Sequence, residues 1–186
     1  TADPRFVAAD MISQAEHGAD SIAGLITPSR KFADNVLLSL DEQSALADRK
    51  EIVEKALQTN GFIIICKNDP DDMAALANAF APEHLEIVTK APKEVADKIT
   101  TAGLILLGLF SPVALSDYAA GTNHVLPTGG YGSVYSGLSA LDFMRRVSIV
   151  EGSKEGLLSA KPAIEVLTAA EKLPGHYKAV ETRFTE

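Results

Sequence analysis

The chain has 186 residues, of which 46% are hydrophobic and 23% are charged, a composition typical of a globular protein. Its 25 acidic and 17 basic residues give a net charge of −8. This charge argues against nucleic-acid binding and against an anionic membrane surface, because both require clustered Lys and Arg. The longest apolar run, residues 102–110, is far shorter than the ~20 residues of a membrane-spanning helix, and we expect it to form a buried strand.

The single cysteine and the start of the chain add two expectations. Cys66 follows the apolar residues 62–65 and has no second cysteine to pair with, so we expect plain core packing and a cytoplasmic protein. The chain begins at Thr1 with neither a methionine nor a signal-peptide pattern, and we therefore expect a segment of a longer protein.

Short apolar runs alternate with segments of helical period along the first 121 residues. The alternation predicts an α/β fold with an incomplete Rossmann-like, mostly parallel sheet, its helices, and a C-terminal helical tail. We expect helices at residues 4–17, 29–46, 48–58, 71–80, 92–101 and 111–121, and strands at residues 21–27, 62–66, 85–89 and 104–109.

Residues 122–137 break this pattern, because they are rich in Gly and Ser and predict a loop. A short helix at 140–145, a strand at 147–151 and a helical tail from about 154 are expected to follow. We place a domain boundary near residue 138, which gives domains of residues 1–138 and 139–186.

Known cofactor motifs are missing from the sequence. Gly130 and Gly132 begin a Gly-x-Gly-x-x-Gly pattern, but Tyr135 stands where the third glycine is required. The sequence contains no P-loop, no His-Glu-x-x-His and no Cys-x-x-Cys. Parallel α/β sheets bind their ligands at the carboxyl ends of strands, so polar residues near strand ends are candidate site residues.

Gln14 and His17 are three residues apart at the end of the first expected helix. Positions three apart share one face of a helix, so the amide oxygen and an imidazole nitrogen could converge on one metal ion. A surface polar pair at a helix end is the alternative interpretation.

Glu83 and His84 are adjacent at the junction between a helix and the strand 85–89. A carboxylate beside an imidazole is a general acid/base set, because the pKa values of both groups can be tuned towards neutrality. A solvated helix end, where His suits the helix dipole, is the alternative.

Asp117 precedes His124 by seven residues, and Glu171 lies about one helical turn before His176. Solvent exposure alone would explain each of these residues. Residue types and spacing therefore indicate an α/β domain with scattered His, Glu, Asp and Gln side chains that suit a metal site, and they do not define a reaction.

Four stretches resemble the histidinol dehydrogenase family, occur in the family's order and contain all four histidines. They are AADMISQAEHGADS (8–21), APEHLEI (81–87), DYAAGTNHVLPTG (117–129) and AEKLPGH (170–176). The resemblance implies the zinc-dependent oxidation of L-histidinol to L-histidine, through histidinal and with two NAD+, in histidine biosynthesis.

The resemblance also implies a role for each matched residue. In the catalytic pair, His84 would take the alcohol proton as hydride leaves to NAD+, and Glu83 would activate the water that hydrates the aldehyde. Zinc would act mainly as a template that orients the substrate. The implied zinc ligands are Gln14, His17, Asp117 and His176, and the implied substrate contacts are His124 and Glu171.

The family chain is more than twice as long, and its first half carries the main NAD contacts, so no cofactor-binding residue is assigned here. The resemblance further implies a homodimer that exchanges the C-terminal tail. A non-catalytic module that binds zinc or another ligand is the alternative function, because the cofactor half is missing from this sequence.

Overall fold

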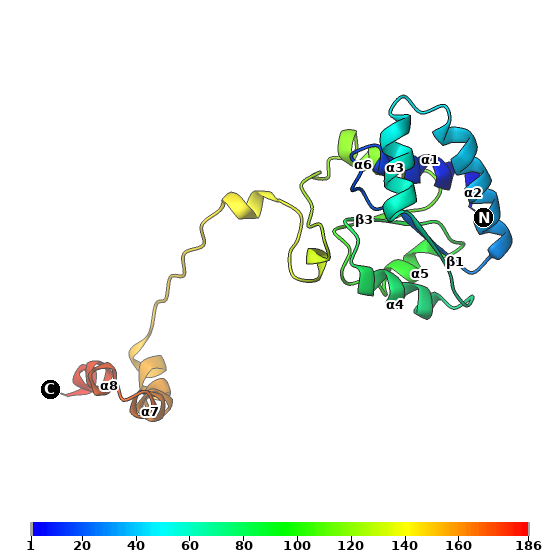
Figure 1. The fold of residues 1–186 in the computed structure, drawn as a ribbon. Coiled ribbons are helices and arrows are strands. Elements are labelled where there is room, and N and C mark those ends of the chain that lie inside the picture. The colour runs from blue at the N-terminus through cyan, green and yellow to red at the C-terminus, as the bar shows by residue number, and fades with distance from the viewer. Residues whose placement is uncertain (1, 186) are drawn as a thin grey trace. The chain divides into compact units, whose positions relative to one another are not determined.

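The computed structural model describes residues 2–185 and divides into two compact units, one ending at Phe143 and one beginning at Met144 (Figure 1). The sequence-based boundary was placed after residue 138. No described helix is both long enough and apolar enough to cross a membrane.

Helices and short parallel strands alternate in the first unit, which confirms the predicted α/β class. Its helices are α1 (Pro4–Ala15), α2 (Arg30–Ser44), α3 (Lys50–Asn60), α4 (Pro70–Phe80), α5 (Pro92–Ala96) and α6 (Val113–Tyr118). Its strands are β1 (Gly24–Thr27), β2 (Phe62–Ile65), β3 (His84–Ile87) and β4 (Leu104–Leu107). Two 3₁₀ turns follow, η1 (Tyr131–Ser133) and η2 (Ala140–Phe143).

The described strands form two parallel pairs, β1 with β2 and β3 with β4, rather than one continuous hydrogen-bonded sheet. Gly24 lies opposite Phe62 in the first pair, and His84 lies opposite Leu104 in the second. Each strand is only four residues long, at the short end of the usual range, so each offers few ladder hydrogen bonds. The parallel direction was predicted correctly.

Side-chain caps explain where three helices begin. Asp3 accepts a hydrogen bond from the Arg5 amide before α1, with Pro4 at the first helical position. Ser29 accepts from the Phe32 amide at the start of α2, and Asp69 accepts from the Asp71 amide at the start of α4.

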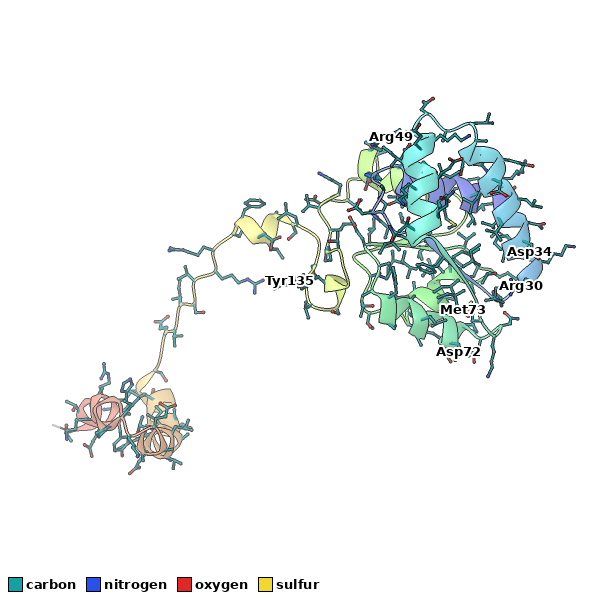
Figure 2. The ribbon with its side chains drawn as sticks, in the orientation of Figure 1. Arg30, Asp34, Arg49, Asp72, Met73 and Tyr135 are labelled. Carbon is teal, nitrogen blue, oxygen red and sulfur yellow. The ribbon has the colours of Figure 1, made fainter. Side chains whose placement is uncertain are left out.

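Helix α1 packs against both α2 and α3. One buried cluster joins Ala8 and Met11 of α1 to Val36 and Leu40 of α2, and a second joins Ala15 to Val53 and Ala56 of α3. In Figure 1 these three helices lie on one side of the strands, and α4 and α5 lie on the other. Helix α2 carries the exposed charged residues Arg30 and Asp34, and exposed Arg49 lies directly before α3 (Figure 2).

The second unit contains α7 (Lys154–Ala170), α8 (Pro174–Glu181) and η3 (Thr182–Phe184), so the predicted helical tail is confirmed. The Lys161 ammonium lies 5.8 Å from the Tyr177 ring centre and 5.9 Å from that of Phe184, within the range of cation–π attraction. The predicted strand at 147–151 is wrong, because residues 144–153 form neither helix nor strand. Its apolar residues have no partner strand among the described residues, and Ile149 and Val150 are each 91% exposed.

We expect Val36→Ala to lower the free energy of unfolding by about 2–3 kcal/mol, because Val36 is 0% exposed and its loss leaves a cavity between α1 and α2. Leu38→Ala on the same helix is the matched control, because Leu38 is 62% exposed and should cost about 0.5 kcal/mol or less. Urea unfolding of both variants measures the difference, and equal losses would contradict the assigned packing of α2.

Candidate acid/base and metal site

A strained turn precedes the Glu83–His84 pair. Helix α4 ends at Phe80, and Ala81 then adopts the left-handed conformation with φ 50° and ψ 64° while its side chain is buried. This conformation costs a residue other than glycine about 1–3 kcal/mol and is often found at functional sites. The turn places the pair at the amino end of β3, so the general rule about the carboxyl ends of strands does not locate it.

The backbone of the pair is tied to the neighbouring strand. Gly103 donates its amide hydrogen to the Pro82 carbonyl at 2.9 Å, and Leu104 donates to the Glu83 carbonyl at 2.8 Å. A Cβ on Gly103 would lie 2.7 Å from the Glu83 carbonyl oxygen, so only glycine allows this close approach. The position of Glu83 and His84 is therefore fixed by β4.

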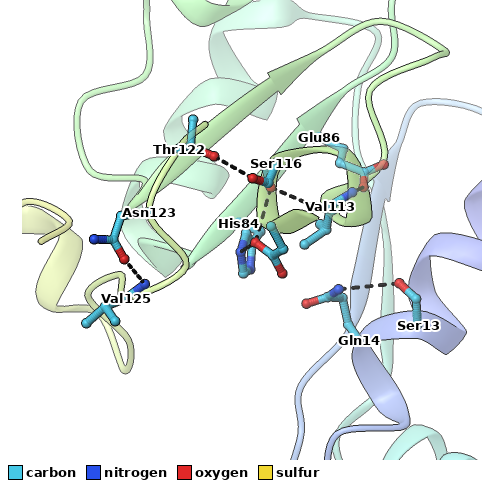
Figure 3. A network of polar contacts seen from close by, with 10 residues as sticks. Ser13, Gln14, His84, Glu86, Val113, Ser116, Thr122, Asn123 and Val125 are labelled. Atoms are coloured by element: carbon cyan, nitrogen blue, oxygen red, sulfur yellow. Dashed lines mark hydrogen bonds and ion pairs between the residues drawn. The ribbon is translucent and has the colours of Figure 1, made fainter. Parts of the chain in front are cut away.

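The imidazole of His84 faces the carboxylate of Asp117. Its Nε2 atom lies 3.9 Å from Asp117 Oδ1, and the two side chains are only 13% and 21% exposed. This distance is too long for a hydrogen bond. Nε2 is buried and has no hydrogen-bond partner among the described residues (Figure 3). A buried polar atom without a partner is costly, so the geometry favours a ligand here.

Asp117 is held in place by its own helix. The Ser116 hydroxyl lies 2.6 Å from the Val113 carbonyl oxygen and 3.3 Å from Asp117 Oδ1, and Ser116 is buried. The Thr122 hydroxyl donates to the Ser116 carbonyl at 2.9 Å and so ties the following loop to α6 (Figure 3).

The predicted helix at residues 4–17 is two residues too long, because α1 ends at Ala15 and Gln14 lies in its last turn. His17 lies in the turn beyond the helix and is exposed. The Gln14 amide nitrogen donates to the Ser13 hydroxyl at 3.3 Å, which leaves the amide oxygen available. Figure 3 shows the Gln14 side chain extending from α1 towards His84.

The remaining candidates, His124, Glu171 and His176, are exposed. His124 lies in the loop after α6, where Asn123 Oδ1 accepts from the Val125 amide at 2.8 Å. In the second unit, Glu171 caps the end of α7 and His176 lies in the first turn of α8. Their roles remain predictions.

Sequence reasoning missed a second polar contact, between Asp10 of α1 and Glu86 of β3. Burial raises the pKa of Glu86 most, the nearby Asp10 charge adds to the effect, and together they bring it to about 8. Burial also raises the pKa of Asp10, and the hydrogen bond with Glu86 opposes that rise. Spacing places Glu86 on the same strand face as His84 and Asp10 one helical turn before Gln14, but it does not show that the two carboxyl groups meet.

The donors suit a metal ion in chemical type. Asp117 and Gln14 offer oxygen atoms in the first unit, and His17 offers an imidazole, a mixture that zinc accepts. Within residues 2–185, no three His, Cys, Asp or Glu side chains are close enough together to hold a metal ion. Gln14 is an amide ligand outside these four residue types, and His176 belongs to the other unit.

A shallow depression of about 290 Å³ lies in the loop region after the site, and no candidate site residue lines it. The depression contains neither of the facing side chains described above, so the His84–Asp117 pair remains the candidate site. The depression is lined by Val125, Leu126, Pro127, Tyr135, Ser136, Leu138 and Asp142.

The fold and the site define an α/β protein in which an imidazole and carboxylates from separate elements face one another, as in enzymes that use acid/base chemistry. The family model for histidinol dehydrogenase matches residues 1–184. The chain belongs to the histidinol dehydrogenase family, which confirms the resemblance found in the sequence.

Individual relatives agree with this assignment. The histidinol dehydrogenase of Bacteroides fragilis is 45% identical over 186 residues, which cover 100% of this chain and 43% of the relative. That of Yersinia pestis is 42% identical over 184 residues, covering 99% and 41%. The crystal structure of histidinol dehydrogenase from Elizabethkingia anophelis matches with a TM-score of 0.94 and 40% identity, covering 99% of this chain and 42% of that one. The chain thus spans less than half the length of these relatives.

We expect ionisation of Glu86 to lower the free energy of unfolding as pH rises from about 4.5 to 8. These are its pKa values in the unfolded and folded states, and between them the folded state keeps a proton that the unfolded state releases. Glu86→Gln removes this proton and should flatten the dependence of the unfolding free energy on pH in that window. Urea unfolding across the window measures it. Glu42→Gln, at an exposed position of α2, is the control and should leave the slope unchanged. An unchanged slope in Glu86→Gln would show that Glu86 is ionised throughout.

Proposed function

We propose that the protein is a histidinol dehydrogenase that oxidises L-histidinol to L-histidine, through histidinal and with two NAD+, in histidine biosynthesis. The observation that carries the proposal is the buried, unpaired Nε2 of His84 beside Asp117, in a chain of this family. The names of the relatives support histidinol as the substrate and oxidation as the reaction.

His84 is the base of the first oxidation in this proposal. A hydride leaves the alcohol carbon for NAD+ while the hydroxyl proton passes to His84 Nε2, which has no hydrogen-bond partner among residues 2–185. An imidazole suits this step because its pKa allows it to gain and lose a proton near neutral pH.

Glu83 acts on water in the second half of the reaction. Its carboxylate takes a proton from a water molecule that adds to the aldehyde carbon, and the hydrated aldehyde then loses the second hydride to NAD+. Two adjacent groups of different type allow one site to serve both oxidations. The half-buried position of Glu83, next to His84 on the same turn, supports this role.

Zinc is the proposed metal, held by Gln14, His17, Asp117 and His176. When bound, it would orient the substrate's polar groups and polarise its oxygen. The free amide oxygen of Gln14 and the fixed carboxylate of Asp117 support this ligand set. His124 and Glu171 are the proposed substrate contacts, and a carboxylate such as Glu171 suits an ammonium group or an imidazole N–H.

We propose that the main NAD contacts come from a part of the protein that this chain does not include, because the chain covers less than half the length of its relatives. We further propose a cytoplasmic homodimer in which residues 139–186 serve the partner's site. No described residue from Met144 onward is buried, and apolar residues such as Leu158, Val166 and Leu167 are exposed. Such a surface supports packing against another chain.

We expect His84→Ala to lower the kcat for histidinol about 10²–10⁴-fold in the gene product that contains this chain, because the general base is lost. Zinc content should stay the same, because His84 is not among the proposed ligands. Steady-state NADH formation and elemental analysis measure the two quantities. His17→Ala is the contrasting variant and should lose zinc. An unaltered rate in His84→Ala would rule out its role as the base.

We expect Glu83→Gln to separate the two oxidations, because an amide cannot take the proton from water. Rapid-mixing experiments should then show one NADH formed quickly per site, with the second formed at least about 10²-fold more slowly. The unsubstituted protein should form both in one continuous course. If Glu83→Gln slows the first NADH as much as the second, Glu83 does not act on water alone.

A further inference from the structure

The carboxyl contact between Asp10 and Glu86 lies among the three elements that carry the candidate site. Glu86 follows His84 by two residues, so both side chains leave the same face of β3. Asp10 precedes Gln14 by one helical turn on α1. The third element is α6, which begins at Val113 and carries Asp117.

Glu86 contacts both neighbouring helices. Its Oε1 atom accepts a hydrogen bond from the Val113 amide at 3.1 Å, and its carboxyl group is a neighbour of that of Asp10, which adds to the rise of its pKa by burial. Pro112 at the start of α6 offers no side-chain cap, so Glu86 satisfies this first amide from another strand. Figure 3 shows Glu86 and Val113 on the side of α6 that faces β3.

Two carboxyl groups can be hydrogen-bonded to each other only when one of them keeps its proton. Burial and the Asp10 charge raise the pKa of Glu86 and so favour the proton on Glu86 at neutral pH. Glu86 then donates its O–H to the Asp10 carboxylate while its other oxygen accepts from Val113. A neutral amide could form the same two bonds.

We propose that Glu86, bonded at once to Asp10 and to the Val113 amide, is a positioning residue that sets the place of Gln14 relative to His84 and Asp117. Its bond to Asp10 holds α1, which carries the Gln14 oxygen, against β3. Its bond to Val113 holds α6, which carries Asp117, against the same strand. The inference rests on the proposed function in that it treats these side chains as parts of one zinc and substrate site.

The test compares substitutions that keep the two hydrogen bonds with substitutions that remove them, in the gene product that contains this chain. Glu86→Gln keeps both bonds, Glu86→Leu removes both, and Asp10→Leu removes only the bond to α1. Hydrogen–deuterium exchange of residues 8–17 and 113–118 gives the first readout, and it requires neither zinc nor turnover. Zinc affinity, from competition with a chelator, gives the second. Glu42→Leu, at an exposed position of α2, is the control.

Glu86→Leu should speed exchange in both segments, Asp10→Leu only in residues 8–17, and Glu86→Gln in neither. Zinc affinity should fall about 10–100-fold in the two leucine variants, the usual effect of losing a residue that supports metal ligands. Glu86→Gln should stay within about threefold of the unsubstituted protein, because the hydrogen bonds are replaced rather than lost.

The proposal is overturned if Glu86→Gln behaves like Glu86→Leu, because an ionised carboxylate would then be required. It is also overturned if Asp10→Leu leaves exchange in residues 8–17 unchanged. If Glu86→Leu does not fold, Asp10→Leu and Glu86→Gln still decide between these outcomes. Absence of histidinol oxidation in the unsubstituted protein would reject the proposed function, whereas the exchange results would still test the role of Glu86.

Discussion

The parallel pairing of β3 with β4 is the constraint on which the candidate site depends. Backbone hydrogen bonds from Gly103 and Leu104 hold the carbonyls of Pro82 and Glu83, so the acid/base pair cannot move without breaking the ladder. The left-handed residue Ala81 turns the chain sharply into this position. The register of the strands therefore fixes the position of His84, the first residue of β3. The buried face of α6 fixes the position of Asp117, which faces His84.

Both apolar contacts and polar contacts position the other site residues. The apolar contacts of α1 with α2 and α3 fix the helix that ends beside Gln14. A different contact joins α1 to β3, because the carboxyl groups of Asp10 on α1 and Glu86 on β3 are neighbours. The site thus combines an apolar framework with one buried carboxyl contact, and the cost of burying that contact is consistent with a functional position.

The sequence predicted the α/β class because apolar runs and helical periods are local patterns, and every strand of the first unit was found to within a few residues. It failed for residues 147–151, since a strand forms only where another strand lies beside it. It made Glu83 and His84 candidates because they are adjacent in the chain. The Asp10–Glu86 contact joins residues 76 positions apart, so only the folded structure shows it. The helix predicted for residues 4–17 was too long because a helix end shifts by two residues without a strong sequence signal.

The central claim is that Gln14, His17, Asp117 and His84 belong to one site that binds histidinol together with zinc. Calorimetric titration of the gene product that contains this chain with L-histidinol, with and without zinc, tests it most directly. If these residues form one site, histidinol binding requires zinc, and Asp117→Ala abolishes histidinol binding. Equally tight binding without zinc, or no binding in either condition, would contradict the account.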